Sequence, residues 1–157
     1  MRSLLIGMFS ILVGCGNATS YVVEDPALES YVEWFQAEAQ KRKVVLDMLD
    51  LVIKFGQTIT PEQPNRIGYC SFSGPRTIVI DASYFLRVSE ARRKALIAHE
   101  MGHCVLYRPH DNRCIVQVGS KCLVSHSLMH PVLDSVDFQN NEMYYLDELF
   151  SKGYGTK

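Results

Sequence analysis

The hydrophobic positions along the chain predict three helices. After Pro26, a residue suited to the first turn of a helix, apolar residues recur at the i, i+3, i+4, i+7 spacing of one helix face. They are Leu28, Tyr31, Val32, Phe35 and Ala39. A second helix is expected after Ser89, a good N-cap residue, with Ala95, Leu96, Ala98 and Met101 on its apolar side. A third is expected after Asn140, with Met143, Leu146, Leu149 and Phe150 on its apolar side.

Short runs rich in apolar and β-branched residues predict three strands between the first two helices. These runs cover residues 51–55, 66–72 and 76–81. The last two are joined by Ser-Gly-Pro, and we expect them to form a hairpin. Beyond about Leu106 the helical period fails, and an irregular segment is expected as far as Asp137. The predicted fold class is α+β, with a small sheet packed on the first helix and on the helix after Ser89.

The composition is that of one globular domain that does not bind nucleic acid. The chain has 157 residues, of which 47% are hydrophobic and 21% charged, and its formal net charge is −1. This length allows one domain with a real core, which we place at residues 26–157. No basic stripe is present, and nucleic-acid binding requires one.

The first residues have the features of a bacterial export signal. Arg2 precedes a short apolar run, residues 4–13, which is too short to cross a bilayer because a spanning helix needs about 20 residues. We therefore expect a signal peptide at residues 1–14. Leu-Val-Gly-Cys at residues 12–15 resembles the lipobox, which implies a lipid on Cys15, a tether at residues 15–25 and a place in the cell envelope. Gly16 after the cysteine favours the outer membrane. A plain signal peptide cut nearby and a buried N-terminal strand are the alternatives.

Four further cysteines, Cys70, Cys104, Cys114 and Cys122, remain for an exported protein. In an oxidising compartment an even number predicts two disulfides, and three connectivities are possible. Cys114 and Cys122 are close enough to close a local loop, which would leave Cys70 with Cys104. A four-cysteine zinc site is the alternative, but the C-x-x-C spacing typical of such sites is absent.

His99, Glu100 and His103 form the arrangement H-E-x-x-H on the second expected helix. Two histidines four residues apart lie on one helix face, so both imidazoles can reach one ion. Glu100 is rotated to one side, where it can take a proton from a water in the ion's open position. Zinc lowers the pKa of such a water to about 7 and polarises the carbonyl under attack. A chance grouping on a solvated face is the alternative, but apolar neighbours make unpaired polar groups there costly.

The third zinc ligand must come from downstream. His110 follows His103 by seven residues, and Ser-Leu-Met-His-Pro follows at residues 127–131. An H-E-x-x-H helix, a histidine soon after it and a downstream Ser-x-Met-x-Pro resemble metzincins, zinc peptidases with a methionine turn beneath the metal. The resemblance covers roughly residues 77–157. It implies an endopeptidase with zinc on His99, His103 and His110, Glu100 as general base, and Met129 in the methionine turn.

The chain departs from the metzincin pattern after the second histidine. Leu106 stands where the family has glycine, and Pro109 stands where it has the third histidine, so His110 comes one residue late. Asp111 is the fallback ligand. In gluzincins, a second zinc-peptidase family, the third ligand is a glutamate on a later helix, and Glu142 after Asn141 resembles that arrangement.

Two other hypotheses belong to different functional classes. The protein could be an envelope lipoprotein in which zinc only holds the fold, or a binding module that keeps a peptidase scaffold. Glu100 favours catalysis, because a structural site has no need of a base. For a peptidase, the expected partner is a peptide or protein substrate lying extended along an edge strand of the 66–81 region.

Overall fold

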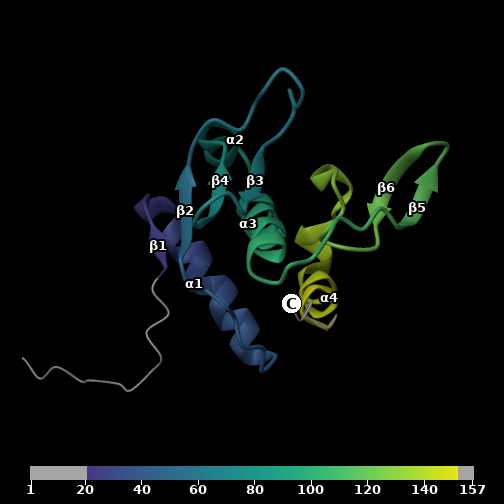
Figure 1. Ribbon diagram of the computed structural model, residues 1–157. Helices are drawn as coiled ribbons and strands as arrows, with labels where there is room; N and C mark the ends of the chain where they lie inside the picture. Colours follow the sequence, from purple (N-terminus) through teal and green to yellow (C-terminus); the bar gives the residue numbers. More distant parts are fainter. Residues whose placement is uncertain (1–20, 152–157) are drawn as a thin grey trace, which may run out of the picture.

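The computed structural model describes residues 21–151, which form an α+β fold around a four-stranded sheet (Figure 1). The strands are β1 (Val22–Val23), β2 (Leu51–Phe55), β3 (Gly68–Ser71) and β4 (Arg76–Ile80). Their order is β1-β2-β4-β3. The first three in this order run parallel, and β3 pairs antiparallel with β4 at one edge. The predicted hairpin is therefore confirmed, and its first strand is an edge strand.

Three helices pack around this sheet, as the hydrophobic pattern predicts. They are α1 (Pro26–Lys41), α3 (Glu90–Cys104) and α4 (Phe138–Ser151). The five residues of the predicted apolar face of α1 are all buried. Helix α3 contacts β3 and β4 on one side and α1 and α4 on others, so it lies at the centre of the molecule. The predicted α+β class is confirmed.

The segment expected to be irregular contains a second, smaller sheet, so that prediction is wrong. Strands β5 (Cys114–Val118) and β6 (Lys121–Ser125) form an antiparallel hairpin that projects from the body of the molecule (Figure 1). A 3-10 turn, η1 (Leu133–Ser135), follows. The hairpin escaped the pattern analysis because Ile115, Val116 and Val118 are all exposed, so hydrophobicity does not alternate between a buried and a solvated face.

Two helix starts differ from the prediction. Helix α4 begins at Phe138 rather than after Asn140, because the side chains of Asn140 and Asn141 donate hydrogen bonds back to Asp137. Asn141 has non-helical backbone angles, and Met143 is 74% exposed rather than on the apolar side. A short helix, α2 (Ala82–Arg87), was not expected, and Asp81 is its N-cap.

Both disulfides of the favoured pairing are present. Cys70 in β3 is joined to Cys104 at the end of α3, and Cys114 is joined to Cys122 across the β5–β6 hairpin. Disulfides are typical of proteins that fold outside the reducing cytosol. The predicted signal peptide and the lipidation at Cys15 lie outside the described residues. Within residues 21–151, no helix has the length and apolar character that crossing a bilayer requires.

Candidate metal centre

Three histidines bring their ring nitrogens together near the C-terminal end of α3. The ligand atoms of His99, His103 and His110 all lie within 4.8 Å of one another. The first two are one turn apart on α3, and the third comes from the segment that follows the helix. The structure thus assembles the three residues that the sequence singles out, and the group can hold a metal ion.

Hydrogen bonds to two carbonyls assign the protons on the helix histidines. His99 Nδ1 lies 2.8 Å from the carbonyl oxygen of Leu128, and His103 Nδ1 lies 2.6 Å from that of Arg108. A carbonyl only accepts, so each Nδ1 carries the hydrogen and each Nε2 keeps its lone pair. This is the tautomer that a metal requires at Nε2.

The two lone pairs face each other at short range. His99 Nε2 and His103 Nε2 are 3.1 Å apart, and neither carries a hydrogen to share. Two bare acceptors so close repel unless a cation lies between them. Tetrahedral ligands about 2.0–2.1 Å from zinc would stand roughly 3.3 Å apart, so the observed spacing fits a zinc ion.

Burial keeps all three imidazoles neutral. It lowers the pKa of His99 to about 3, with further lowering from the neighbouring histidines. Burial also lowers the pKa of His103. The pKa of His110 is lowered first by burial and then by the neighbouring His130. Neutral imidazole is the metal-binding form, so the site is ready for a cation at neutral pH without first losing protons.

Glu100 lies beside the histidines as an isolated buried carboxyl group. The residue is 4% exposed, and its Oε2 has no hydrogen-bond partner among the described residues. Burial raises its pKa to about 8, while the charge of Arg66 acts in the opposite direction. A buried carboxyl without partners is costly, and this one lines the same cleft as the histidines. The raised pKa leaves this group protonated near neutral pH when no cation is close, whereas a cation held by the histidines would favour the ionised form, which accepts a proton.

Two glycines make room for this arrangement. A β-carbon at Gly68, in the edge strand, would come within 2.8 Å of Glu100 Oε1. A β-carbon at Gly102, between the two helix histidines, would collide with the sulfur of Met129. Met129 is fully buried, so its side chain lies directly against the helix that carries the site.

The chain reverses sharply after α3 and so returns His110 to the site. Tyr107 takes a left-handed conformation with φ 53°, which is uncommon for a residue with a β-carbon. Its ring stacks on Phe72, and its hydroxyl accepts a hydrogen bond from Arg76. The same arginine donates to the carbonyl of Cys104 at the helix end. A glycine at position 107 would adopt this conformation without strain. Here the contacts of the Tyr107 ring and hydroxyl stabilise the reversal instead.

The alternative ligands lie elsewhere. Asp111 groups with His126 and Glu148 rather than with the helix histidines, and its carboxylate pairs with Arg113. Glu142 forms an ion pair with Lys94 at 3.6 Å. His130 is buried and turned toward Cys114. Neither carboxylate is part of the three-histidine group.

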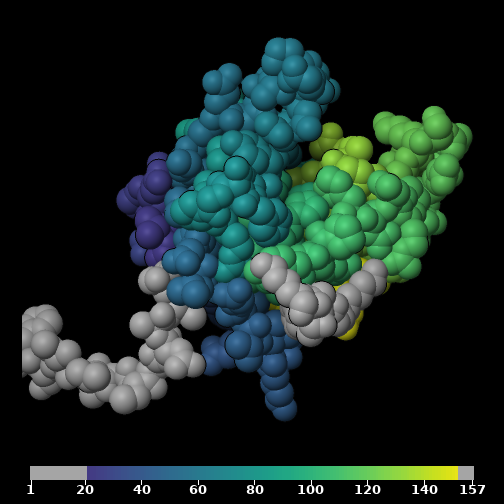
Figure 2. All heavy atoms as spheres, viewed as in Figure 1, coloured from purple at the N-terminus to yellow at the C-terminus, as the bar shows by residue number. Residues whose placement is uncertain are grey.

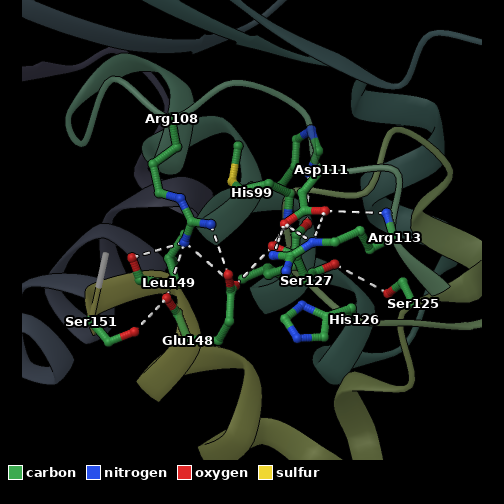
Figure 3. A network of polar contacts seen from close by, with 12 residues as sticks. His99, Arg108, Asp111, Arg113, Ser125, His126, Ser127, Glu148, Leu149 and Ser151 are labelled. Carbon is green, nitrogen blue, oxygen red and sulfur yellow. Dashed lines mark hydrogen bonds and ion pairs between the residues drawn. The ribbon is translucent and has the colours of Figure 1, made fainter. Parts of the chain in front are cut away.

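A buried ion pair near the centre was not identified from the sequence. Arg108 and Glu148 lie 2.8 Å apart, and each side chain is 8% exposed. Glu148 also accepts a hydrogen bond from Ser127 Oγ at 2.8 Å (Figure 3). The three residues are far apart in the chain, so no spacing rule connects them. The sequence pattern draws attention to Ser127 as part of Ser-x-Met-x-Pro, but it does not indicate that Ser127 contacts Glu148.

The histidines and Glu100 lie in a cleft of about 1170 Å³. One side is formed by the loop before β3 and by the edge strand itself, from Gln63 to Cys70. The other side is formed by residues 131–134. In Figure 2, a hollow in this face separates the blue-green atoms of that loop from the green atoms of the β5–β6 hairpin, and the hairpin residues are not among those that line the cleft. A cleft of this size beside an edge strand can admit an extended peptide.

Comparison of the chain with protein-family models, curated proteins and solved structures finds no match. The functional argument therefore rests on the residues of the site.

Proposed function

We propose that the protein is a zinc-dependent endopeptidase of metzincin-like type. The observation that carries this proposal is the buried carboxyl group of Glu100, whose Oε2 has no hydrogen-bond partner among the described residues, in the same cleft as three histidines whose ring nitrogens converge. A purely structural metal site is satisfied by its ligands and has no use for such a group. The methionine packed beneath the site and the edge strand beside it support the same proposal.

The chain's residues divide the chemistry among them. His99, His103 and His110 would hold the metal through Nε2 atoms or, for His110, through a ring nitrogen within reach of the others. Zinc, when bound, acts as a Lewis acid that polarises a carbonyl and makes water a nucleophile near neutral pH. Glu100 takes a proton from the attacking water and passes it to the nitrogen of the leaving amine.

Strand β3 provides the surface for substrate. It is at the edge of the sheet, and Gly68 to Cys70 line the cleft. An extended peptide can add to such an edge through main-chain hydrogen bonds. The lack of a β-carbon at Gly68 keeps the strand close to Glu100, so a peptide bond held along β3 would lie near the base.

Export and anchoring are the sequence-based part of the proposal. The two disulfides agree with a protein that folds outside the cytosol. A lipid on Cys15 would hold it in the bacterial envelope, at the outer membrane. Incorporation of a labelled fatty acid into the full chain, abolished by Cys15→Ser, tests the anchor.

The decisive variant is Glu100→Gln. We expect the wild-type protein and the variant each to contain one zinc per chain, because Glu100 is not a ligand. Cleavage of unfolded casein should occur with the wild-type protein and fall by at least about 100-fold in the variant, the lower end of what a general acid–base group typically contributes. Metal content and cleavage are measured on the same samples.

Glu90→Gln is the matched control, since Glu90 lies in the first turn of the same helix, away from the site. It should keep full activity. Stoichiometric zinc without cleavage of a broad substrate panel would favour the structural or binding-module alternative. Absence of zinc from the wild-type protein would reject the metal centre itself.

A further inference from the structure

Two carbonyl groups outside α3 orient the two helix histidines. Leu128 O accepts from His99 Nδ1, and Arg108 O accepts from His103 Nδ1. One carbonyl belongs to the methionine-turn segment and the other to the reversal after α3. The direction of each Nε2 therefore depends on where these two separate segments of backbone lie.

A single carboxylate on the last helix holds both segments. Glu148 Oε1 accepts from Arg108 Nη2 at 2.8 Å, and Glu148 Oε2 accepts from Ser127 Oγ at 2.8 Å. Ser127 Oγ in turn accepts from the backbone N–H of Met129 at 3.1 Å, which places Leu128 between two fixed residues. Figure 3 shows Glu148 between Arg108 and Ser127.

This connection is shielded from water. The side chains of Arg108 and Glu148 are each 8% exposed, and Ser127 is fully buried. Arg108 also donates to the carbonyls of Glu148 and Leu149 in α4. Removing one partner of a buried ion pair leaves the other charge uncompensated, so loss of the carboxylate should displace Arg108 and its carbonyl rather than merely weaken a surface contact.

We propose that Glu148 is a positioning residue for the metal centre and sets the orientation of both His99 and His103. It touches neither the metal nor the substrate. Loss of a group hydrogen-bonded directly to a metal-ligating histidine typically changes metal affinity by about 10–100-fold, and Glu148 acts one contact behind two such groups. The inference rests on the metal centre of the proposed function but not on peptidase activity.

The test measures zinc affinity by competition with a chromophoric chelator, and the visible absorption of the cobalt-substituted protein. Glu148→Ala should weaken zinc binding by about 10–100-fold and alter the cobalt spectrum, because the ligand geometry changes. Glu148→Gln, which keeps the shape and some hydrogen bonds, should give a smaller loss. Ser127→Ala removes only one of the two connections and should also weaken binding.

Asp147→Ala is the matched control. Asp147 is the neighbouring acid on α4, is 63% exposed and pairs with Arg42, outside this network. It should leave zinc affinity and the cobalt spectrum unchanged. Circular dichroism and the unfolding temperature of the zinc-free proteins separate loss of positioning from loss of the fold.

Wild-type zinc affinity and an unchanged cobalt spectrum in folded Glu148→Ala would overturn the proposal. If that variant does not fold, the same result in Ser127→Ala and Glu148→Gln overturns it. Zinc binding without peptidase activity in the wild-type protein would reject the proposed function and leave this inference standing. Absence of zinc binding in the wild-type protein would reject both.

Discussion

At the scale of single residues, the contact between Gly102 and Met129 shows how closely the site helix is packed. A β-carbon at Gly102 would overlap the Met129 sulfur and lie 3.2 Å from Leu149 Cδ1. All three residues are buried, so neither neighbour can move into solvent. The absence of one side chain brings Met129 and the last helix against the segment between the two histidines.

Gly102→Ala should therefore destabilise the protein although alanine favours helix. Overpacking a core costs about 1–3 kcal/mol, and replacing glycine within a helix returns up to about 1 kcal/mol. We expect a net loss of roughly 1–2 kcal/mol in the free energy of unfolding, measured by denaturant titration.

Met129→Ala provides the control for that substitution. In this background the collision is removed, so Gly102→Ala should be neutral or stabilising, and a double-mutant cycle measures the difference. An equal effect of Gly102→Ala in both backgrounds would show that the sulfur contact does not decide its cost.

At the scale of elements, Asp81 joins the sheet to the short helix that precedes α3. Its Oδ1 accepts from the backbone N–H of Tyr84 and from Ser83 Oγ, and its own N–H donates to Ile67 O. The Ser83 hydroxyl and then the Tyr84 N–H hold the pKa of this carboxyl group below its ordinary value of 3.8. The end of β4, the start of α2 and the residue before β3 thus meet at one residue.

Asp81→Ala should lower the free energy of unfolding at pH 7 by about 1 kcal/mol, the usual effect of losing an N-cap. Because the folded-state pKa is lowered, the stabilisation from the ionised carboxylate is complete above about pH 3.8 and is lost as the pH falls through the folded-state value. The difference in the free energy of unfolding between wild type and Asp81→Ala should therefore become smaller below that pH. Unfolding curves at several pH values measure it.

Asp81→Asn separates the cap from the charge. Asparagine caps helices about as well as aspartate, so this variant should keep most of the stability at pH 7. Its free energy of unfolding should not contain the contribution that wild type loses when Asp81 is protonated at low pH. A constant difference between wild type and Asp81→Asn down to pH 2 would contradict the role given to the carboxylate.

At the scale of the whole molecule, the two disulfides constrain very different lengths of chain. Cys70 and Cys104 are 34 residues apart and connect the edge strand with the end of the site helix. Cys114 and Cys122 are only 8 residues apart within one hairpin. A disulfide that closes a longer loop removes more conformational entropy from the unfolded chain.

Replacing each pair by alanine should reveal this difference. Loop entropy predicts a loss of about 4 kcal/mol for Cys70→Ala with Cys104→Ala, and about 2.5 kcal/mol for Cys114→Ala with Cys122→Ala. The first pair should also weaken zinc binding, because Cys104 follows His103. Denaturant unfolding and zinc competition measure both effects, and a larger loss from the hairpin pair would refute the prediction.

The local parts of the molecule could be predicted from the sequence because neighbouring residues decide them. The buried face of α1, the start of α3 at Ser89 and the position of β2 follow from periodicity and capping. His99 and His103 share a helix face through a spacing of four, whatever surrounds the helix. The β5–β6 hairpin could not be found in this way, since most of its large apolar residues are exposed.

From the sequence alone follow the fold class, three of the four strands of the sheet and the grouping of His99, His103 and His110, and the favoured disulfide pairing is the one present. Only the tertiary structure decided how that grouping is held. Glu148, Arg108 and Ser127 meet from three distant segments, and the edge strand lies close to the Glu100 carboxyl group because Gly68 has no β-carbon. The physical reason is that helix geometry depends on residues a few positions apart, whereas burial and long-range ion pairs depend on which segments the completed core brings together.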